Sequence, residues 1–180
     1  MMFRILLLGI MISSAALAGN APDGNALAYF KEAEKLEELR NSRQVSMKEI
    51  TEMLKDKNTV LLDTRSDQDF KRLHIRGAKH LSYADFTTDR ITKMFPDKNT
   101  RIIVYCDKAI ANPLTRMMAL STNAFVDLHM QGYSNIYEMQ GASQGRTFLD
   151  QCRNLMDIPF EGDSRAIASL KQGAVSCLSR

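Results

Sequence analysis

The sequence predicts an α/β fold in which helices cover a parallel β-sheet. Three short apolar runs have the composition of buried strands, at residues 60–62, 102–105 and 135–137. Helical segments lie in between, at residues 67–72, 88–95 and 113–131. Strands that alternate with helices are the order of a parallel sheet, because each crossover helix returns the chain to the edge where the previous strand began.

Local signals mark the ends of the helices. Ser46 and Glu49 have the spacing of a capping box, which predicts that a helix begins after Ser46. The longest helix, residues 113–131, has Pro113 in its first turn and Gly132 just past its end. These are the positions that proline and glycine favour in helices.

The first eighteen residues have the three-part layout of a secretory signal peptide. Arg4 supplies a positive charge, residues 5–12 are apolar without interruption, and Ala16–Ala18 matches an A-x-A cleavage site. The apolar run is too short for the roughly 20 residues that span a bilayer, so cleavage after Ala18 is favoured over a retained membrane helix. The sequence therefore predicts a Sec-type signal and a periplasmic or secreted protein that is not embedded in the membrane.

The rest of the chain divides into three parts. Residues 19–44 comprise a polar, flexible segment and a charged helix over residues 26–40. Residues 45–142 hold the strands and helices of the α/β domain, and residues 143–180 form a helical extension. Two helices are expected in that extension, at residues 146–155 and 164–172, and Gly173 should end the second.

The composition excludes several classes of function. The chain of 180 residues has a net charge of +3 and no basic block, so a nucleic-acid partner is not indicated. It contains neither a P-loop nor a dinucleotide-binding glycine pattern, and it lacks a C-x-x-C redox motif. His80 and His129 are isolated in the sequence without metal-ligand spacing around them, so no metal site is expected.

Cys106 is the strongest candidate for chemistry. It follows the strand at residues 102–105, at the carboxyl end where open parallel sheets bind their ligands. The next residues lead into the long helix, so backbone N–H groups and a helix N-terminus can face the sulfur. Such an environment stabilises a thiolate and makes it a nucleophile. The alternative is an inert, buried cysteine at a strand end.

Cys152 and Cys177 are the other two cysteines of the chain. They bracket a short C-terminal segment, and a disulfide between them would contribute roughly 3 kcal/mol in the chain-entropy model. An oxidising compartment favours this pairing, which by parity leaves Cys106 as a thiol. A buried Cys106 without function satisfies the same parity.

Four motifs follow one another at characteristic distances along the chain. In order they are a strand ending in D-x-R (Leu61–Arg65), an acidic–aromatic pair (Asp69–Phe70), H-I-x-G-A (His74–Ala78), and a strand ending Tyr105–Cys106 followed by a helix, the segment Gly132–Tyr137 and Gly141. Together they resemble the rhodanese family. The resemblance covers about residues 45–141.

This resemblance implies a five-stranded parallel sheet flanked by helices, and a thiosulfate or thiol sulfurtransferase activity. In rhodaneses a cysteine thiolate takes sulfane sulfur from a small donor, becomes a persulfide and passes the sulfur to a thiol or another nucleophile, with no metal or organic cofactor. Cys106 is the matching residue. In the family the residues that match Asp63 and Arg65 brace neighbouring loops. His74 and Gly77 are also expected to be structural, with His74 hydrogen-bonded to backbone.

The loop after Cys106 departs from the family pattern. Rhodaneses have an arginine six residues after the cysteine, whereas this chain has Asn112 there and its first downstream arginine is Arg116. Glycine, which lets such loops curl sharply, does not occur in the loop. A larger or differently shaped cradle is expected. Its candidate substrate-binding residues are Asp107, Lys108, Ala109, Ile110, Ala111, Asn112 and Arg116.

Two alternatives to sulfur transfer remain open. The altered loop and the charged N-terminal helix are also typical of a catalytically inactive rhodanese-like module that binds a periplasmic protein or a small anion. A thiol phosphatase is the weaker alternative, because related folds that transfer phosphoryl groups use the arginine that is replaced here by Asn112.

Overall fold

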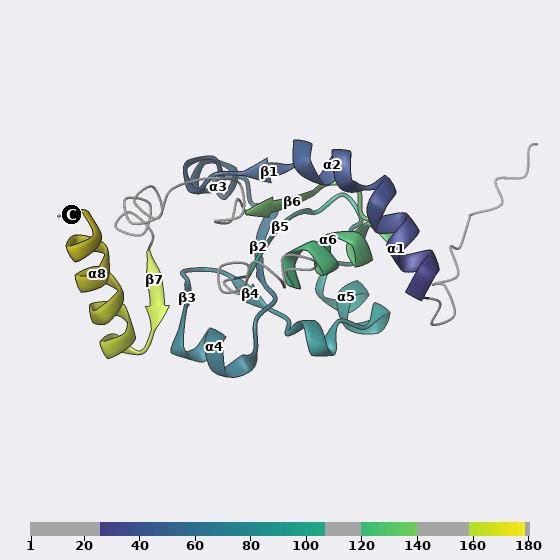
Figure 1. Cartoon of the computed structure of the whole chain (residues 1–180). Coiled ribbons are helices and arrows are strands. Elements are labelled where there is room, and N and C mark those ends of the chain that lie inside the picture. The colour runs from purple at the N-terminus through teal and green to yellow at the C-terminus, as the bar shows by residue number, and fades with distance from the viewer. Residues whose placement is uncertain (1–25, 107–119, 140–158, 179–180) are drawn as a thin grey trace, which may run out of the picture.

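The computed structural model describes residues 26–106, 120–139 and 159–178 (Figure 1). Its main sheet has five parallel strands in the order β1–β6–β5–β2–β4. The strands are β1 (Gln44–Val45), β2 (Thr59–Asp63), β4 (Lys79–His80), β5 (Arg101–Tyr105) and β6 (Ile136–Met139). The predicted α/β class and the five-stranded parallel sheet are both confirmed.

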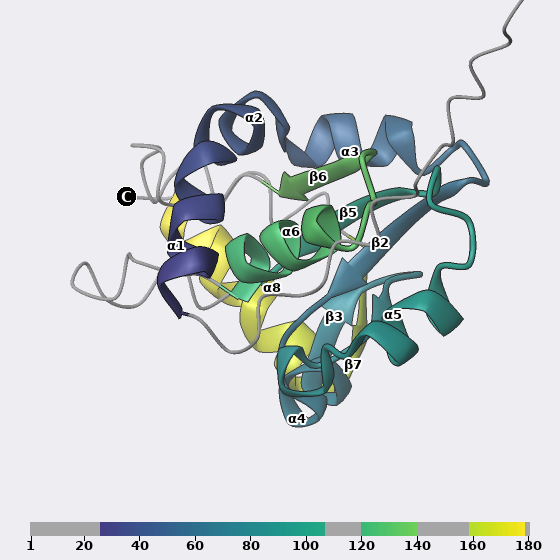
Figure 2. The same ribbon diagram turned by 90° about the vertical axis from the view of Figure 1, so that its right-hand side faces the viewer.

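Helices lie on both faces of this sheet (Figure 2). The helices are α1 (Ala26–Lys35), α2 (Glu37–Ser42), α3 (Met47–Met53), α4 (Asp67–Arg72), α5 (Thr88–Met94), α6 (Leu120–Met130), α8 (Ser164–Leu178) and the 3-10 turn η1 (Tyr83–Asp85). Within the described residues, no helix has the length and apolar character of a membrane span.

The central strands send alternate side chains into two cores, as the two-residue period of a strand requires. In β5, Ile102 and Val104 pack with α5 and α6 on one face, whereas Ile103 and Tyr105 pack with α3 on the other. The first core consists of Leu62, Leu81, Ile91, Phe95, Ile102, Val104, Ala124, Phe125, Leu128, Tyr133 and Ile136. The second consists of Val45, Ile50, Leu61, Ile75, Ile103 and Tyr105.

Two helix ends form as the local signals predict. Ser46 caps α3 in a complete capping box, because its hydroxyl accepts from the Glu49 N–H while the Glu49 carboxylate accepts from the Ser46 N–H. After α6, Gly132 adopts φ +87°, and the N–H of Tyr133 donates to the Leu128 carbonyl over 3.1 Å. This is a Schellman ending, which the left-handed backbone of glycine allows.

The charged N-terminal helix is two helices rather than one. α1 ends at Lys35 and α2 begins at Glu37. Leu36 between them is buried, with 7% of its surface exposed, whereas neither helix contains a buried residue. The joint is therefore the most buried part of this segment, and Leu39 of α2 also packs against the first core.

The C-terminal segment contains a strand that the sequence pattern did not predict. β7 (Phe160–Gly162) pairs antiparallel with β3 (Leu73–Ile75), in a two-stranded sheet separate from the main one. Gly162 has φ +130°, and a Cβ atom there would lie 2.5 Å from the Arg72 carbonyl oxygen. Only glycine therefore allows β7 to approach the end of α4 so closely.

The last helix is longer than predicted. It was expected to end at Gly173, but α8 continues through that residue to Leu178. A glycine inside a helix costs only about 1 kcal/mol relative to alanine, so helix formers on both sides can carry the helix through it. The expected signal peptide, the flexible residues 19–25 and the helix at residues 146–155 lie outside the described residues.

Candidate active site at the end of β5

Cys106 directly follows β5, the central strand of the sheet, and 8% of its surface is exposed. It carries a thiol rather than half of a disulfide. The peptide before it is fixed by Thr64, the first residue after β2. The backbone N–H and the hydroxyl of Thr64 both donate to the Tyr105 carbonyl, over 3.3 and 3.1 Å. The neighbouring strand thus orients the backbone that leads into Cys106.

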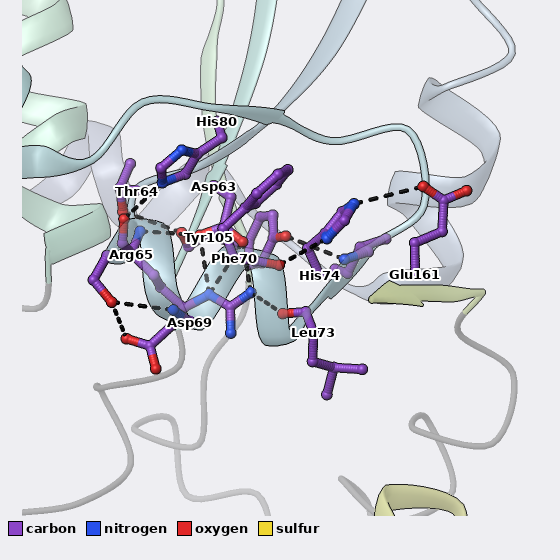
Figure 3. A network of polar contacts seen from close by, with 12 residues as sticks. Asp63, Thr64, Arg65, Asp69, Phe70, Leu73, His74, His80, Tyr105 and Glu161 are labelled. Carbon is purple, nitrogen blue, oxygen red and sulfur yellow. Dashed lines mark hydrogen bonds and ion pairs between the residues drawn. The ribbon is translucent and has the colours of Figure 1, made fainter. Parts of the chain in front are cut away.

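Asp63 and Arg65 form a buried ion pair beside this point (Figure 3). Asp63 is fully buried and Arg65 is 6% exposed. The Arg65 guanidinium donates from Nε to both carboxylate oxygens, over 3.0 and 3.1 Å, and from Nη2 over 2.6 Å. The Arg65 backbone N–H also donates to Asp63 Oδ1. Several charge-assisted hydrogen bonds therefore compensate the desolvation of both groups.

The same pair connects three segments of the chain. Arg65 Nη2 donates to the Leu73 carbonyl over 2.5 Å, and His80 Nε2 lies 2.9 Å from the Arg65 carbonyl. The end of β2 is thereby joined to the start of β3 and to β4. The ion pair of Asp63 and Arg65 thus holds three segments together at this edge of the sheet.

Tyr105 carries the network across to β3. Its hydroxyl accepts from the Ile75 N–H over 3.2 Å, and its ring lies 5.6 Å from the Arg65 guanidinium carbon. Burial raises the pKa of Tyr105 above its usual value, and the negative charge of Asp63 raises it further. Tyr105 is therefore neutral at physiological pH, and its hydroxyl serves as a structural hydrogen-bonding group.

His74 is hydrogen-bonded within the same network. Its Nδ1 lies 2.8 Å from the Phe70 carbonyl, which can only accept, so Nδ1 carries the proton. Its other nitrogen faces the Glu161 carboxylate of β7 over 3.5 Å. The predicted bond from His74 to backbone is present, although the carbonyl belongs to helix α4.

The Phe70 ring is in contact with two imidazoles. It stacks on His74 with ring centres 3.9 Å apart and on His80 with centres 4.5 Å apart. His80, isolated in the sequence, is thus packed into the same network, where its Nδ1 also lies 3.4 Å from the Asp67 carboxylate. The acidic–aromatic motif and the histidine motif belong to one cluster (Figure 3).

Gly77 closes the turn that follows β3. Its φ is +80°, and the Ala78 N–H donates to the Ile75 carbonyl over 3.0 Å. A positive φ at the third position of such a four-residue turn favours glycine. The role of Gly77 in the structure is to reverse the chain.

Several other predicted site residues lie outside the described part of the chain. Residues 107–119, which include Asp107, Lys108, Ala109, Ile110, Ala111, Asn112 and Arg116, lie outside the described residues. Cys152 does as well, and Cys177 belongs to α8 in a stretch whose side chains are not described. The expected cradle and the Cys152–Cys177 disulfide therefore stay predictions. In the described parts of the chain, no group of three or more metal-ligating side chains is found.

Sequence reasoning missed two polar residues near this edge of the sheet. Thr64 is the middle residue of the D-x-R motif and was not predicted to have a role. In the structure its hydroxyl donates to the Tyr105 carbonyl, next to Cys106. Glu138 was missed because the predicted strand stopped at Tyr137, whereas β6 continues to Met139. A glutamate inside an apolar strand is the signal that could have identified it, since buried carboxylates occur almost only with partners.

Comparison with known proteins gives the family. The model of the rhodanese-like domain family matches residues 46–145. A search of curated proteins finds no match. Similar solved structures include a rhodanese with anions from E. coli, with 22% identity, a TM-score of 0.41, and coverage of 58% of this chain and 99% of the other.

Two further structures share this low identity. The rhodanese-like domain of an Anabaena protein is 21% identical, with a TM-score of 0.49 and coverage of 71% of this chain and 82% of that one. A polysulfide-sulfur transferase from Wolinella succinogenes is 19% identical, with a TM-score of 0.47 and coverage of 76% and 90%. Because the family model matches more than half of the chain, the protein belongs to the rhodanese-like domain family.

Proposed function

We propose that the protein is a sulfurtransferase that carries sulfane sulfur as a persulfide on Cys106. Its membership of the rhodanese-like family supports this function. The observation that carries the proposal is the position of Cys106: it follows the central strand at the carboxyl edge of the sheet, and two hydrogen bonds from Thr64 orient the peptide before it. A reacting sulfur needs such a fixed backbone, because small misplacements are costly in rate.

With thiosulfate as the donor, the Cys106 thiolate attacks the outer, sulfane sulfur. A bond forms between Cys106 Sγ and that sulfur, while the bond to the sulfonate sulfur breaks and sulfite leaves with the electron pair. The product is a Cys106 persulfide anion. An acceptor thiolate then attacks the terminal sulfur, so that the acceptor leaves as a persulfide and the Cys106 thiolate is regenerated.

Intact-mass spectrometry tests this step directly. The reduced protein, incubated with thiosulfate or an organic polysulfide, should gain the mass of one sulfur atom and lose it again on addition of a thiol. Cys106→Ser should gain nothing, whereas the matched controls Cys152→Ser and Cys177→Ser should gain sulfur as the wild type does. A reduced Cys106 that takes sulfur from neither donor would contradict the proposal and favour an inactive binding module.

We further propose that the protein works in the periplasm or outside the cell after cleavage behind Ala18. The support is the sequence of residues 1–18 alone. Expression in a bacterium and N-terminal sequencing of the exported protein should give a chain that begins at Gly19. A cytoplasmic protein that keeps residues 1–18 would contradict this location, and with it the expected Cys152–Cys177 disulfide.

A further inference from the structure

Glu138 is a buried carboxylate with four side-chain donors around it. It lies in β6 and is 4% exposed. Its Oε1 accepts from the hydroxyls of Ser121 and Thr122, over 2.7 and 3.2 Å. Its Oε2 accepts from Arg40 Nη1 over 2.7 Å and from Gln44 Nε2 over 2.5 Å. Both oxygens are thus satisfied in the ionised form.

These donors come from elements that flank the candidate nucleophile. Glu138 pairs in register with Val104 of β5, two residues before Cys106. Ser121 and Thr122 lie in the first turn of α6, which is the next described helix after Cys106. The end of β5 and the start of α6 as described therefore meet at Glu138, one through the strand register and the other through two hydroxyls.

The remaining two donors belong to the N-terminal part of the chain. Arg40 lies in α2 and Gln44 in β1, so both precede residue 46, where the match to the family model begins. In Figure 1, β6 lies between α2 and α6. The Arg40 side chain is 18% exposed and also binds Glu37 over 2.9 Å. A segment outside the family match is thus connected to the same carboxylate as α6.

We propose that Glu138 is a positioning residue that holds α6 against the end of β5 and thereby sets the reactivity of the Cys106 thiol. Ser121 transmits this constraint on the side of α6, and Arg40 extends it to the N-terminal helices. The inference rests on the proposed function only in taking Cys106 as the reacting group. The buried ion pair of Glu138 and Arg40 is expected to fix how the elements around it are arranged. It adds little net stability, because a well-packed pair of apolar side chains often stabilises a fold as much.

The test is the pH dependence of Cys106 alkylation by iodoacetamide, which reports the thiolate and needs no sulfur transfer. It is measured in a Cys152→Ser/Cys177→Ser background, so that Cys106 alone reacts. Glu138→Gln and Ser121→Ala should each move the midpoint of the alkylation profile upward by about half a pH unit or more. In sulfur transfer they should lower kcat about tenfold with little change in KM.

The sign of the shift separates positioning from simple charge effects. Loss of a carboxylate near the sulfur would by charge alone favour the thiolate and move the midpoint of Glu138→Gln downward. Ser121→Ala changes no charge, so an upward shift there reports position only, and it keeps the proposal testable if Glu138→Gln does not fold. Glu37→Gln, which removes the exposed partner of Arg40, is the matched control and should leave the midpoint unchanged.

An unchanged midpoint in Ser121→Ala, or a downward shift in Glu138→Gln, would overturn the inference. The failure of the proposed function has a different signature. If Cys106 accepts no sulfur but both variants still shift the alkylation profile upward, the positioning role holds and only the sulfurtransferase assignment is lost.

Discussion

The hydroxyl of Tyr105 accepts a hydrogen bond from the backbone N–H of Ile75 over 3.2 Å. Ile75 is the last residue of β3, and Tyr105 is the residue before Cys106. Because β3 also pairs with β7, one side chain joins the central strand to the sheet that contains the C-terminal segment. The strand end beside Cys106 is therefore supported from two directions, by Thr64 on its carbonyl and by Ile75 on its side chain.

Tyr105→Phe removes the hydroxyl that accepts from the Ile75 N–H. Ile75 is only 4% exposed, so its N–H is left buried without this partner. The free energy of unfolding should fall by about 1–3 kcal/mol, the cost of a buried donor that loses its partner. Denaturant titration measures the change. Tyr29→Phe is the control, since its hydroxyl is only partly buried and hydrogen-bonds to the Asn123 side chain over 3.4 Å and to Tyr83, and its loss should cost clearly less. Equal losses in the two variants would argue against the role given to Tyr105.

Asp63→Asn removes the negative charge against which Arg65 is buried. We expect a loss of about 3–5 kcal/mol in unfolding free energy, because a buried charge that loses its partner keeps its desolvation cost. Thermal unfolding gives the comparison. Asp67→Asn is the matched control on the same segment, and its exposed side chain, 69% accessible, should cost less than about 1 kcal/mol. A loss below 1 kcal/mol for Asp63→Asn would show that the pair is not needed.

Gly162→Ala should detach the C-terminal segment without unfolding the main sheet. The new Cβ would lie 2.5 Å from the Arg72 carbonyl oxygen, and the φ of +130° is unfavourable for alanine. Limited proteolysis should cut the variant near β7 several-fold faster than the wild type. Gly173→Ala is the control, because a Cβ there meets nothing within 4 Å and alanine favours the helix. Slow cleavage of Gly162→Ala would mean that β7 can move and accommodate the methyl group.

Asp127→Asn should change how stability depends on pH. Burial raises the pKa of Asp127, although the hydrogen bond from Tyr83 over 2.8 Å opposes that shift. A carboxyl group with a raised pKa stabilises the fold when it is protonated, and this contribution is lost as the pH rises through its folded-state pKa. The variant should therefore gain most over the wild type at pH 7, and the gain should shrink toward pH 4. Denaturant titrations at both pH values measure it, and a gain that grows on acidification would reverse the assigned sign.

Features that depend on neighbouring residues could be predicted from the sequence. The capping box of Ser46 and Glu49 and the glycine ending at Gly132 are local, so their signals are complete within a few residues. The two long strands β2 and β5 could be predicted because both are buried on two faces, so that their middle residues, 60–62 and 102–104, are all apolar. Cys106 was identified for the same reason, since it follows the clearest apolar run.

Features that depend on residues far apart in the sequence could not be predicted from it. β7 has three residues and forms only because β3 supplies its partner far away along the chain. From the sequence alone, Glu138 indicates the end of a strand, because a charged side chain is usually exposed. Its burial within β6 depends on Arg40 and Ser121, which are distant in sequence and bind its carboxylate. Helix α8 passes Gly173 because one glycine is a weak stop signal without a left-handed turn. In each case tertiary contacts decide what local propensity leaves open.

The pairing of β3 with β7 also has a consequence for biosynthesis. The ribosome makes residues 73–75 long before residues 160–162. Until β7 has been made, β3 therefore has an unpaired edge, because β7 is the strand that it pairs with. An unpaired strand edge can pair with strands of other chains and so start aggregation. Truncation ahead of Phe160 would make that transient hazard permanent.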